Sequence, residues 1–146
     1  MIGAARHSLS RWKFRHSVVV WIGIALNLAL AVPLLFAPRW VLGLFGIPVE
    51  ASTIWPQFAG GLLILLSVFY VPMTFDLDRY RVFAWLSVFP SRAFGVVFFL
   101  TALLGGAPAG FFAGVLIDGV IAIASLYCLI QIAKLEQDIV TGKVPA

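Results

Sequence analysis

Long uncharged stretches are the dominant pattern along this chain. Residues 17–38 and 51–75 contain no Asp, Glu, Lys or Arg, and residues 82–133 contain only two. The sequence GGAPAG near the middle of the third stretch is a strong turn signal and divides it in two. A helix needs about 20 apolar residues to cross the roughly 30 Å hydrocarbon core of a bilayer. The pattern therefore predicts four transmembrane helices, at residues 17–37, 55–73, 82–104 and 109–133.

The composition supports this pattern. Hydrophobic residues make up 62% of the 146 residues and charged residues only 11%, whereas a soluble domain carries about 25% charged residues. We therefore expect an all-α fold, an integral membrane four-helix bundle over 17–133. A basic leader precedes it at 1–16, and a tail follows at 134–146.

The basic residues outside these spans predict the orientation of the chain. Eight of them share one side: Arg6, Arg11, Lys13, Arg15, Arg79, Arg81, Lys134 and Lys143. Only Arg39 lies opposite. Because loops rich in Lys and Arg stay in the cytoplasm, we expect both termini and the middle loop to be cytoplasmic.

Two short interfacial helices are also predicted. The leader, RHSLSRWKFRH, fits a surface helix whose Arg6, Arg11, Lys13 and Arg15 contact anionic lipids or a partner protein; an orientation signal with no further role is the alternative. The leader and the apolar run with Ala29-Leu30-Ala31 also resemble a secretory signal, but we expect them to be retained. PRWVLGLFG predicts the second helix, within the 37–54 loop.

The candidate functional residues are Arg92 and Asp118, the two charges inside the spans. A charged side chain near the bilayer centre costs at least about 2.5 to 3.5 kcal/mol. Counted from the turn at 105–110, Asp118 lies about three residues, or roughly 4.5 Å, from the depth of Arg92. Helical side chains lean toward the helix N-terminus, which directs these two apart. Several interpretations of these two charges stay open. They are a direct pair, a link through water or Ser91, contact with a lipid, a quinone-like ligand or another subunit, and a proton path through Asp118.

Small residues share one face of the fourth span with Asp118. They are Gly110, Gly114, Ala122 and Ser125, and Gly95 on the third span is the candidate notch opposite them. Small residues let membrane helices approach closely. We expect packing within the chain, with docking of another protein as the alternative. We expect three phenylalanine side chains of the third span to point toward lipid, namely Phe94, Phe98 and Phe99.

No motif for catalysis, phosphate binding or metal binding occurs in the sequence. His7 and His16 lie in the leader, outside the predicted core, and Cys128 fits an apolar packing role. The loop FDLDRYR carries both signs of charge and is expected to pair with itself. We therefore expect no enzyme and no metal, and the net charge of +4 reflects membrane orientation rather than binding of nucleic acid.

Three segments, PRWVLGLFGIP, WPQFAGGLLILLSVFYVP and FDLDRYRVFAW, together with Arg92, resemble the DoxX-like families of small four-span bacterial membrane proteins. The resemblance covers about residues 20 to 130. It implies a four-helix bundle in the inner membrane and, for some relatives, association with redox enzymes that exchange electrons with quinone. It assigns no catalytic residue.

Two functions follow as hypotheses. The first is a non-catalytic accessory subunit of a larger bacterial membrane complex, redox or photosynthetic, with membrane lipids and other subunits as partners. The alternative is a quinone- or lipid-binding membrane protein whose polar site is Arg92 and Asp118. A bound lipid or quinone is the only cofactor expected.

Overall fold

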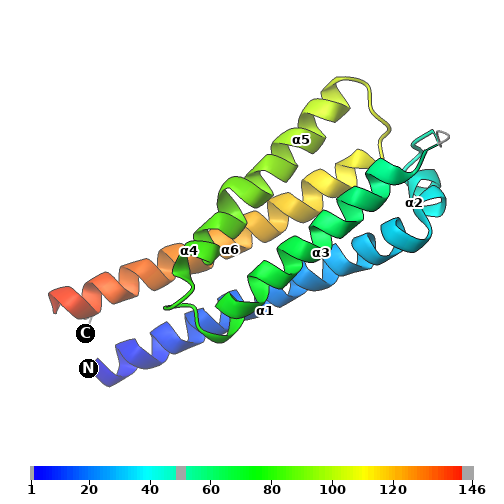
Figure 1. Ribbon diagram of the computed structural model, residues 1–146. Coiled ribbons are helices and arrows are strands. Elements are labelled where there is room, and N and C mark those ends of the chain that lie inside the picture. Colours follow the sequence, from blue (N-terminus) through cyan, green and yellow to red (C-terminus); the bar gives the residue numbers. More distant parts are fainter. Residues whose placement is uncertain (1, 49–51, 143–146) are drawn as a thin grey trace.

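The computed structural model describes residues 2–48 and 52–142, and every regular element within them is helical (Figure 1). The elements in chain order are α1 (Ile2–Phe36), α2 (Pro38–Leu44), α3 (Ile54–Phe75), α4 (Arg81–Leu86), the π-helical turn η1 (Ser87–Arg92), α5 (Ala93–Leu104) and α6 (Phe111–Thr141).

Four helical segments are long and apolar enough to cross a membrane, which confirms the predicted number of spans. They are Ala5–Phe36, Ile54–Phe75, Arg81–Leu104 and Phe111–Thr141. The third is composite, because α4, η1 and α5 follow one another without a connecting loop. These four segments indicate a multi-pass membrane protein with a helical bundle.

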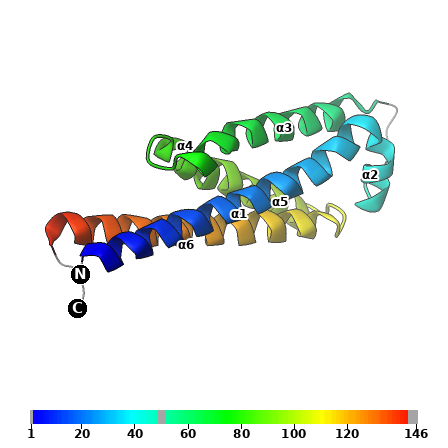
Figure 2. The same ribbon diagram turned by 90° about the horizontal axis from the view of Figure 1, so that it is seen from below.

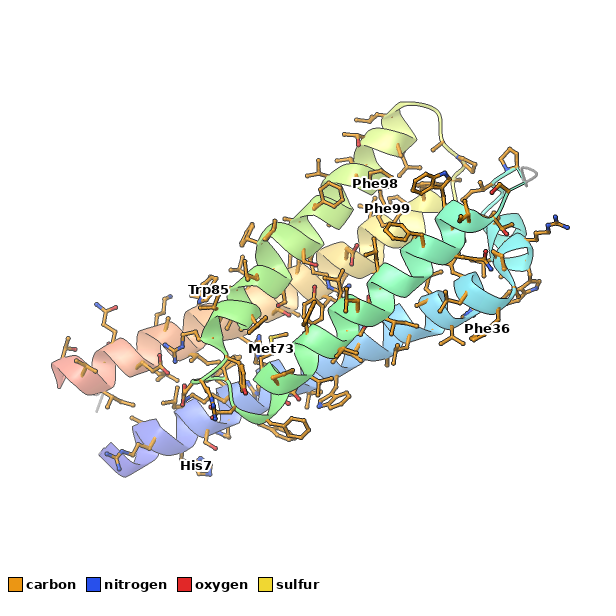
Figure 3. All side chains as sticks on the ribbon, viewed as in Figure 1. His7, Phe36, Met73, Trp85, Phe98 and Phe99 are labelled. Carbon is orange, nitrogen blue, oxygen red and sulfur yellow. The ribbon has the colours of Figure 1, made fainter. Side chains whose placement is uncertain are left out.

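Helix α1 is central to the bundle, since it packs against both α3 and α6, and α5 packs against α6 (Figure 1). The described chain begins and ends at the same end of the bundle, together with the 76–80 connection; we call this the terminal end. The main hydrophobic cluster lies in this half and includes Val20, Tyr70, Met73 and Leu129. Met73 is only 1% exposed and points into this core (Figure 3).

The leader is not a separate helix, because α1 runs without a break from Ile2 to Phe36. Where the membrane boundary falls along α1 stays a prediction. Helix α1 has 35 residues and α6 has 31, or about 52 and 46 Å, well beyond the roughly 30 Å that a span needs. Both extend past the α3–α4 connection at the terminal end (Figure 2). No Gly or Pro interrupts residues 4–17, and Trp12 packs edge-on against Tyr127 of α6 with ring centroids 5.4 Å apart. Helix propensity and this packing therefore continue α1 through the leader.

The predicted helix of the 37–54 loop is present as α2. It begins with Pro38, which suits a first helical position because its missing N–H would be unpaired there. Phe45, just after α2, approaches α6 closely: a Cβ added to Gly110 would lie 2.6 Å from the Phe45 carbonyl oxygen. This contact fixes α2 over the end of the bundle opposite the termini. Its position at a membrane surface stays a prediction.

An ion-pair cluster connects the elements at the terminal end. Lys13 Nζ lies 2.6 Å from Asp78 Oδ2, and Arg81 donates to both carboxylate oxygens of Glu136 at 2.6 and 2.8 Å. Arg81 Nη2 also lies 3.1 Å from Asp78 Oδ1. The loop therefore pairs with itself through Arg81 and Asp78, as the sequence predicts, and it also pairs with α1 and α6, which the sequence did not predict. Lys13, expected to contact lipid or a partner, has its charge neutralised within the chain.

This cluster gives a pH-dependent contribution to stability. The hydrogen bond from Lys13 is the main cause that lowers the pKa of Asp78 from its ordinary value of 3.8. Because the folded pKa is the lower one, the stabilisation is complete above the unfolded pKa and is lost as the pH falls through the folded pKa. The side chain is 61% exposed, so we expect less than about 1 kcal/mol.

Thermal unfolding of the protein and of Asp78→Asn, in the same detergent from pH 7 to pH 3, measures this contribution. The unfolding temperature of the variant should be lower at pH 7, and the difference should shrink below about pH 4. A difference that stays constant down to pH 3 would show that ionisation of Asp78 plays no part.

Candidate functional site

Arg92 lies just after a break in the third span. Phe89, inside η1, has the extended backbone angles φ −122° and ψ 117°, and Pro90 follows it without an N–H to donate. Arg92 is the last residue of η1, and regular helix resumes at Ala93. Its side chain is 7% exposed, so the guanidinium is held inside the bundle.

A direct ion pair joins the two candidate residues. Arg92 Nη1 lies 2.5 Å from Asp118 Oδ1 and donates a hydrogen bond to it. The Asp118 side chain is 20% exposed and is therefore more accessible than its partner. The pair joins η1 and α6 and neutralises both charges, although the lean of helical side chains directs them apart.

Two glycines explain how the side chains meet. A Cβ at Gly95 would overlap Asp118 Oδ2, so the carboxylate lies across the α5 backbone where a side chain would otherwise stand. A Cβ at Gly23 of α1 would lie 2.7 Å from Arg92 Nη2. The pair therefore fits between a notch on α5 and a notch on α1. Sequence analysis singled out Gly95 but missed Gly23, whose only signal is a glycine inside an apolar span.

Other polar groups gather around the pair. Asn27 of α1 donates to Ser67 Oγ at 3.3 Å, and Ser67 donates to the Leu63 carbonyl oxygen. Tyr70 and Ser91 share a hydrogen bond of 2.5 Å between their hydroxyl oxygens. A void of about 10 Å³ lies beside Arg92, lined by Tyr70, Ser87 and Ser125 among others, and is about the size of one water molecule.

A larger cavity opens on the other side of the pair, toward α2. Its volume is about 360 Å³. Asp118 and Asn27 are its main polar side chains, and α1, α2, α3, α5 and α6 all contribute to the wall. Apolar and aromatic residues form most of that wall, including Leu26, Leu30, Trp40, Val41, Phe45, Leu63 and Phe99. The arrangement is an apolar chamber with a carboxylate and an amide on its wall.

The small-residue face of α6 packs within the chain at several points. A Cβ at Gly114 would lie 2.5 Å from the Phe99 ring, and Gly110 meets the backbone of Phe45. Ser125 is buried and Ala122 is partly buried. Phe94 and Phe98 are exposed as expected, but Phe99 points inward over Gly114 and lines the cavity (Figure 3). The absence of a side chain at Gly114 makes the space that this ring occupies.

The basic leader residues divide into two groups. Arg6, Arg11 and Arg15 are exposed and form no salt bridge within the described residues, whereas Lys13 is paired with Asp78. His7 is also exposed, at the free end of α1 (Figure 3).

His16 is fully buried, which corrects its expected place outside the core. Neither ring nitrogen has a hydrogen-bond partner within residues 2–48 and 52–142. Because the leader continues α1 into the bundle, His16 is enclosed by packed helices. The same residues contain no cluster of three or more His, Cys, Asp or Glu that could hold a metal ion.

Comparison with protein-family models, with curated proteins and with solved structures finds no match for this chain. The DoxX-like resemblance therefore stays a prediction, and the geometry of the site carries the functional argument.

Proposed function

We propose that this protein is a multi-pass protein of the bacterial inner membrane that binds a neutral amphiphile, of the quinone or lipid class, in the cavity beside Arg92 and Asp118. The observation that carries this proposal is the cavity of about 360 Å³ with Asp118 and Asn27 on its wall. Small-molecule sites typically measure about 300 to 1,000 Å³, with apolar walls and a few polar groups that fix the orientation of the ligand.

The charge of the site favours a neutral head group. Because Arg92 neutralises Asp118, an anionic head would meet a carboxylate and a cationic head would have to compete with Arg92. Asp118 can accept a hydrogen bond from a hydroxyl, and the Asn27 amide can donate or accept one. These groups suit the hydroxyl or carbonyl of a quinol, a quinone or a neutral lipid, with the apolar tail along the aromatic wall.

The orientation follows from the distribution of basic residues. Among the described residues, the terminal end carries seven of the ten Lys and Arg residues of the chain, so we expect it to be cytoplasmic by the positive-inside rule. The cavity then lies in the outer half of the membrane, under α2. A ligand would enter from the outer leaflet.

The accessory-subunit hypothesis gains no specific support from the contacts. The packing of Trp12 on Tyr127 and the pairing of Lys13 with Asp78 hold the leader within the chain. The role of a subunit stays a prediction, and the mass of the complex after gentle extraction tests it.

Filling the cavity is expected to displace its ligand. Ala29 is exposed and lines the cavity, so Ala29→Trp should occupy the space of the ligand tail. Ala25 is also exposed, lies one helical turn away and is not among the lining residues, which makes Ala25→Trp a matched control. We expect the protein and the control to retain about one amphiphile per chain after purification, and Ala29→Trp to retain at least tenfold less.

Native mass spectrometry gives the stoichiometry, and mass analysis of the extracted amphiphile identifies it as a quinone or a lipid. Bound amphiphile at the same level in Ala29→Trp and Ala25→Trp, or none in the parent protein, would contradict the proposal.

A further inference from the structure

A second surface, separate from the cavity, has the features of a lipid site. A groove of about 410 Å³ lies between α1 and α6 in the half of the bundle near the termini. Val18, Val19 and Ala124 form its apolar walls, and Cys128, which is buried, lies beneath. Phe14, Arg15 and Tyr127 complete the lining. The groove is therefore apolar along its length and has a cation and a phenol beside it.

The guanidinium of Arg15 lies over an aromatic ring. The Arg15 guanidinium carbon lies 4.6 Å from the centroid of the Trp12 ring, a cation–π distance. Trp12 in turn packs edge-on against Tyr127, which also lines the groove. Arg15 is thus positioned by contacts that leave its N–H groups free to bind an anion. A guanidinium of this kind suits a phosphate, because it offers two parallel N–H donors.

The charge of Arg15 is available for a ligand. Lys13 and Arg81 at the same end form salt bridges with Asp78 and Glu136, whereas Arg15 forms none among the described residues. Arg11 is exposed four residues earlier, so it lies on the same side of α1 and adds a second positive charge. The groove thus has a net positive charge at its polar end.

The sequence favours a position of Arg15 near the lipid head groups. Arg15 is the last Lys or Arg before the uncharged residues 17–38 of α1. Phe14 beside it is apolar and 71% exposed, as expected for a side chain that contacts lipid on an interfacial stretch of helix. A ligand here would place its polar group at Arg15 and its tail against Val18, Val19 and Ala124.

We propose that this groove binds an anionic phospholipid, with the phosphate on Arg15 and the Tyr127 hydroxyl and one acyl chain between α1 and α6. Charge complementarity selects this occupant, since a zwitterionic lipid brings its own cation to a site that already has one. The proposal does not depend on the function of the cavity, because no residue lines both the groove and the cavity.

Lipid binding to the purified full chain tests this inference. The probes are phosphatidylglycerol and phosphatidylethanolamine with identical acyl chains, added to delipidated protein and counted by native mass spectrometry. The parent protein should bind phosphatidylglycerol at least about fivefold more tightly, the effect of one nearby basic residue. Arg15→Gln should lose this preference.

Arg79→Gln is the matched control for charge. Arg79 is exposed, lies 5.7 Å from the Tyr80 ring centroid and is not among the residues lining the groove. Removing it should leave the preference intact. Equal losses in Arg15→Gln and Arg79→Gln, or no preference in the parent protein, would overturn the proposal, because binding would then follow total charge or nothing at all.

Filling the groove with a larger side chain is a second, independent test of the proposal. Ala124→Trp should fill the groove and reduce binding of phosphatidylglycerol about fivefold or more, while Ile123→Trp should not, since Ile123 is 71% exposed and lies outside the groove. Thermal unfolding of each variant confirms that it is folded. Unchanged binding in a folded Ala124→Trp variant would also overturn the proposal.

Discussion

Gly95→Ala is expected to destabilise the protein by about 3 kcal/mol. The added Cβ would occupy the position of Asp118 Oδ2. The other oxygen of the same carboxylate, Oδ1, accepts the hydrogen bond from Arg92. Either the α5–α6 contact must open or Asp118 must leave its partner. Forcing extra atoms into a packed interior typically costs about 1 to 3 kcal/mol, and displacement of a buried ion pair places this variant at the upper end.

Gly61→Ala is the matched control for this variant. A Cβ at Gly61 of α3 would meet nothing within 4 Å, so alanine there fits without any displacement. Its stability should equal or slightly exceed that of the parent, because alanine favours helix by up to about 1 kcal/mol over glycine. Unfolding by denaturing detergent, followed by circular dichroism, measures both variants. Equal stabilities of Gly95→Ala and Gly61→Ala would contradict the observed close approach.

Loss of the Asp118 carboxylate should have the largest effect of all. Asp118→Leu leaves the guanidinium of Arg92 buried without its carboxylate, and arginine stays protonated in proteins. Breaking a buried pair on one side typically costs about 3 to 5 kcal/mol. Arg92→Leu should be less harmful, because the Asp118 side chain left without a partner is 20% exposed, whereas that of Arg92 is only 7% exposed.

Thr101→Val serves as the control for replacing a polar side chain by an apolar one on α5. The Thr101 hydroxyl is exposed and bonds only to carbonyl oxygens of its own helix among the described residues. Its removal should change the unfolding free energy by less than about 0.5 kcal/mol. Comparable losses in Thr101→Val and Asp118→Leu would show that the pair has no special role.

The spans could be predicted because the bilayer imposes a simple rule on sequence. Charged residues are excluded from about 20 consecutive positions in each span. The number of such uncharged stretches therefore gives the number of helices. The turn at 105–110 carries its own glycine and proline signal. The leader could not be separated from α1 in this way, because its helix is stabilised by Trp12 against Tyr127, a contact between residues 115 positions apart.

The sequence could not decide whether Arg92 and Asp118 contact each other directly, for a related reason. Counting along ideal helices gives depth but not lateral distance, and the glycine notches at 23 and 95 set that distance. The cavity is less predictable still, since it depends on how five helices and Phe45, just after α2, meet. Phe99 shows what the sequence cannot predict. Its ring points inward because Gly114 leaves space for it, whereas the rings of Phe94 and Phe98 are exposed.

The double variant Arg92→Leu with Asp118→Leu tests the central claim, that these two charges neutralise each other inside the bundle. Its unfolding free energy is measured in the same detergent series as the parent and both single variants. Because no isolated charge remains, the double variant should be more stable than Asp118→Leu alone, with a coupling energy of about 2 kcal/mol. If the losses of the two single variants simply add in the double variant, the two side chains act independently and the ion pair does not form in the folded protein.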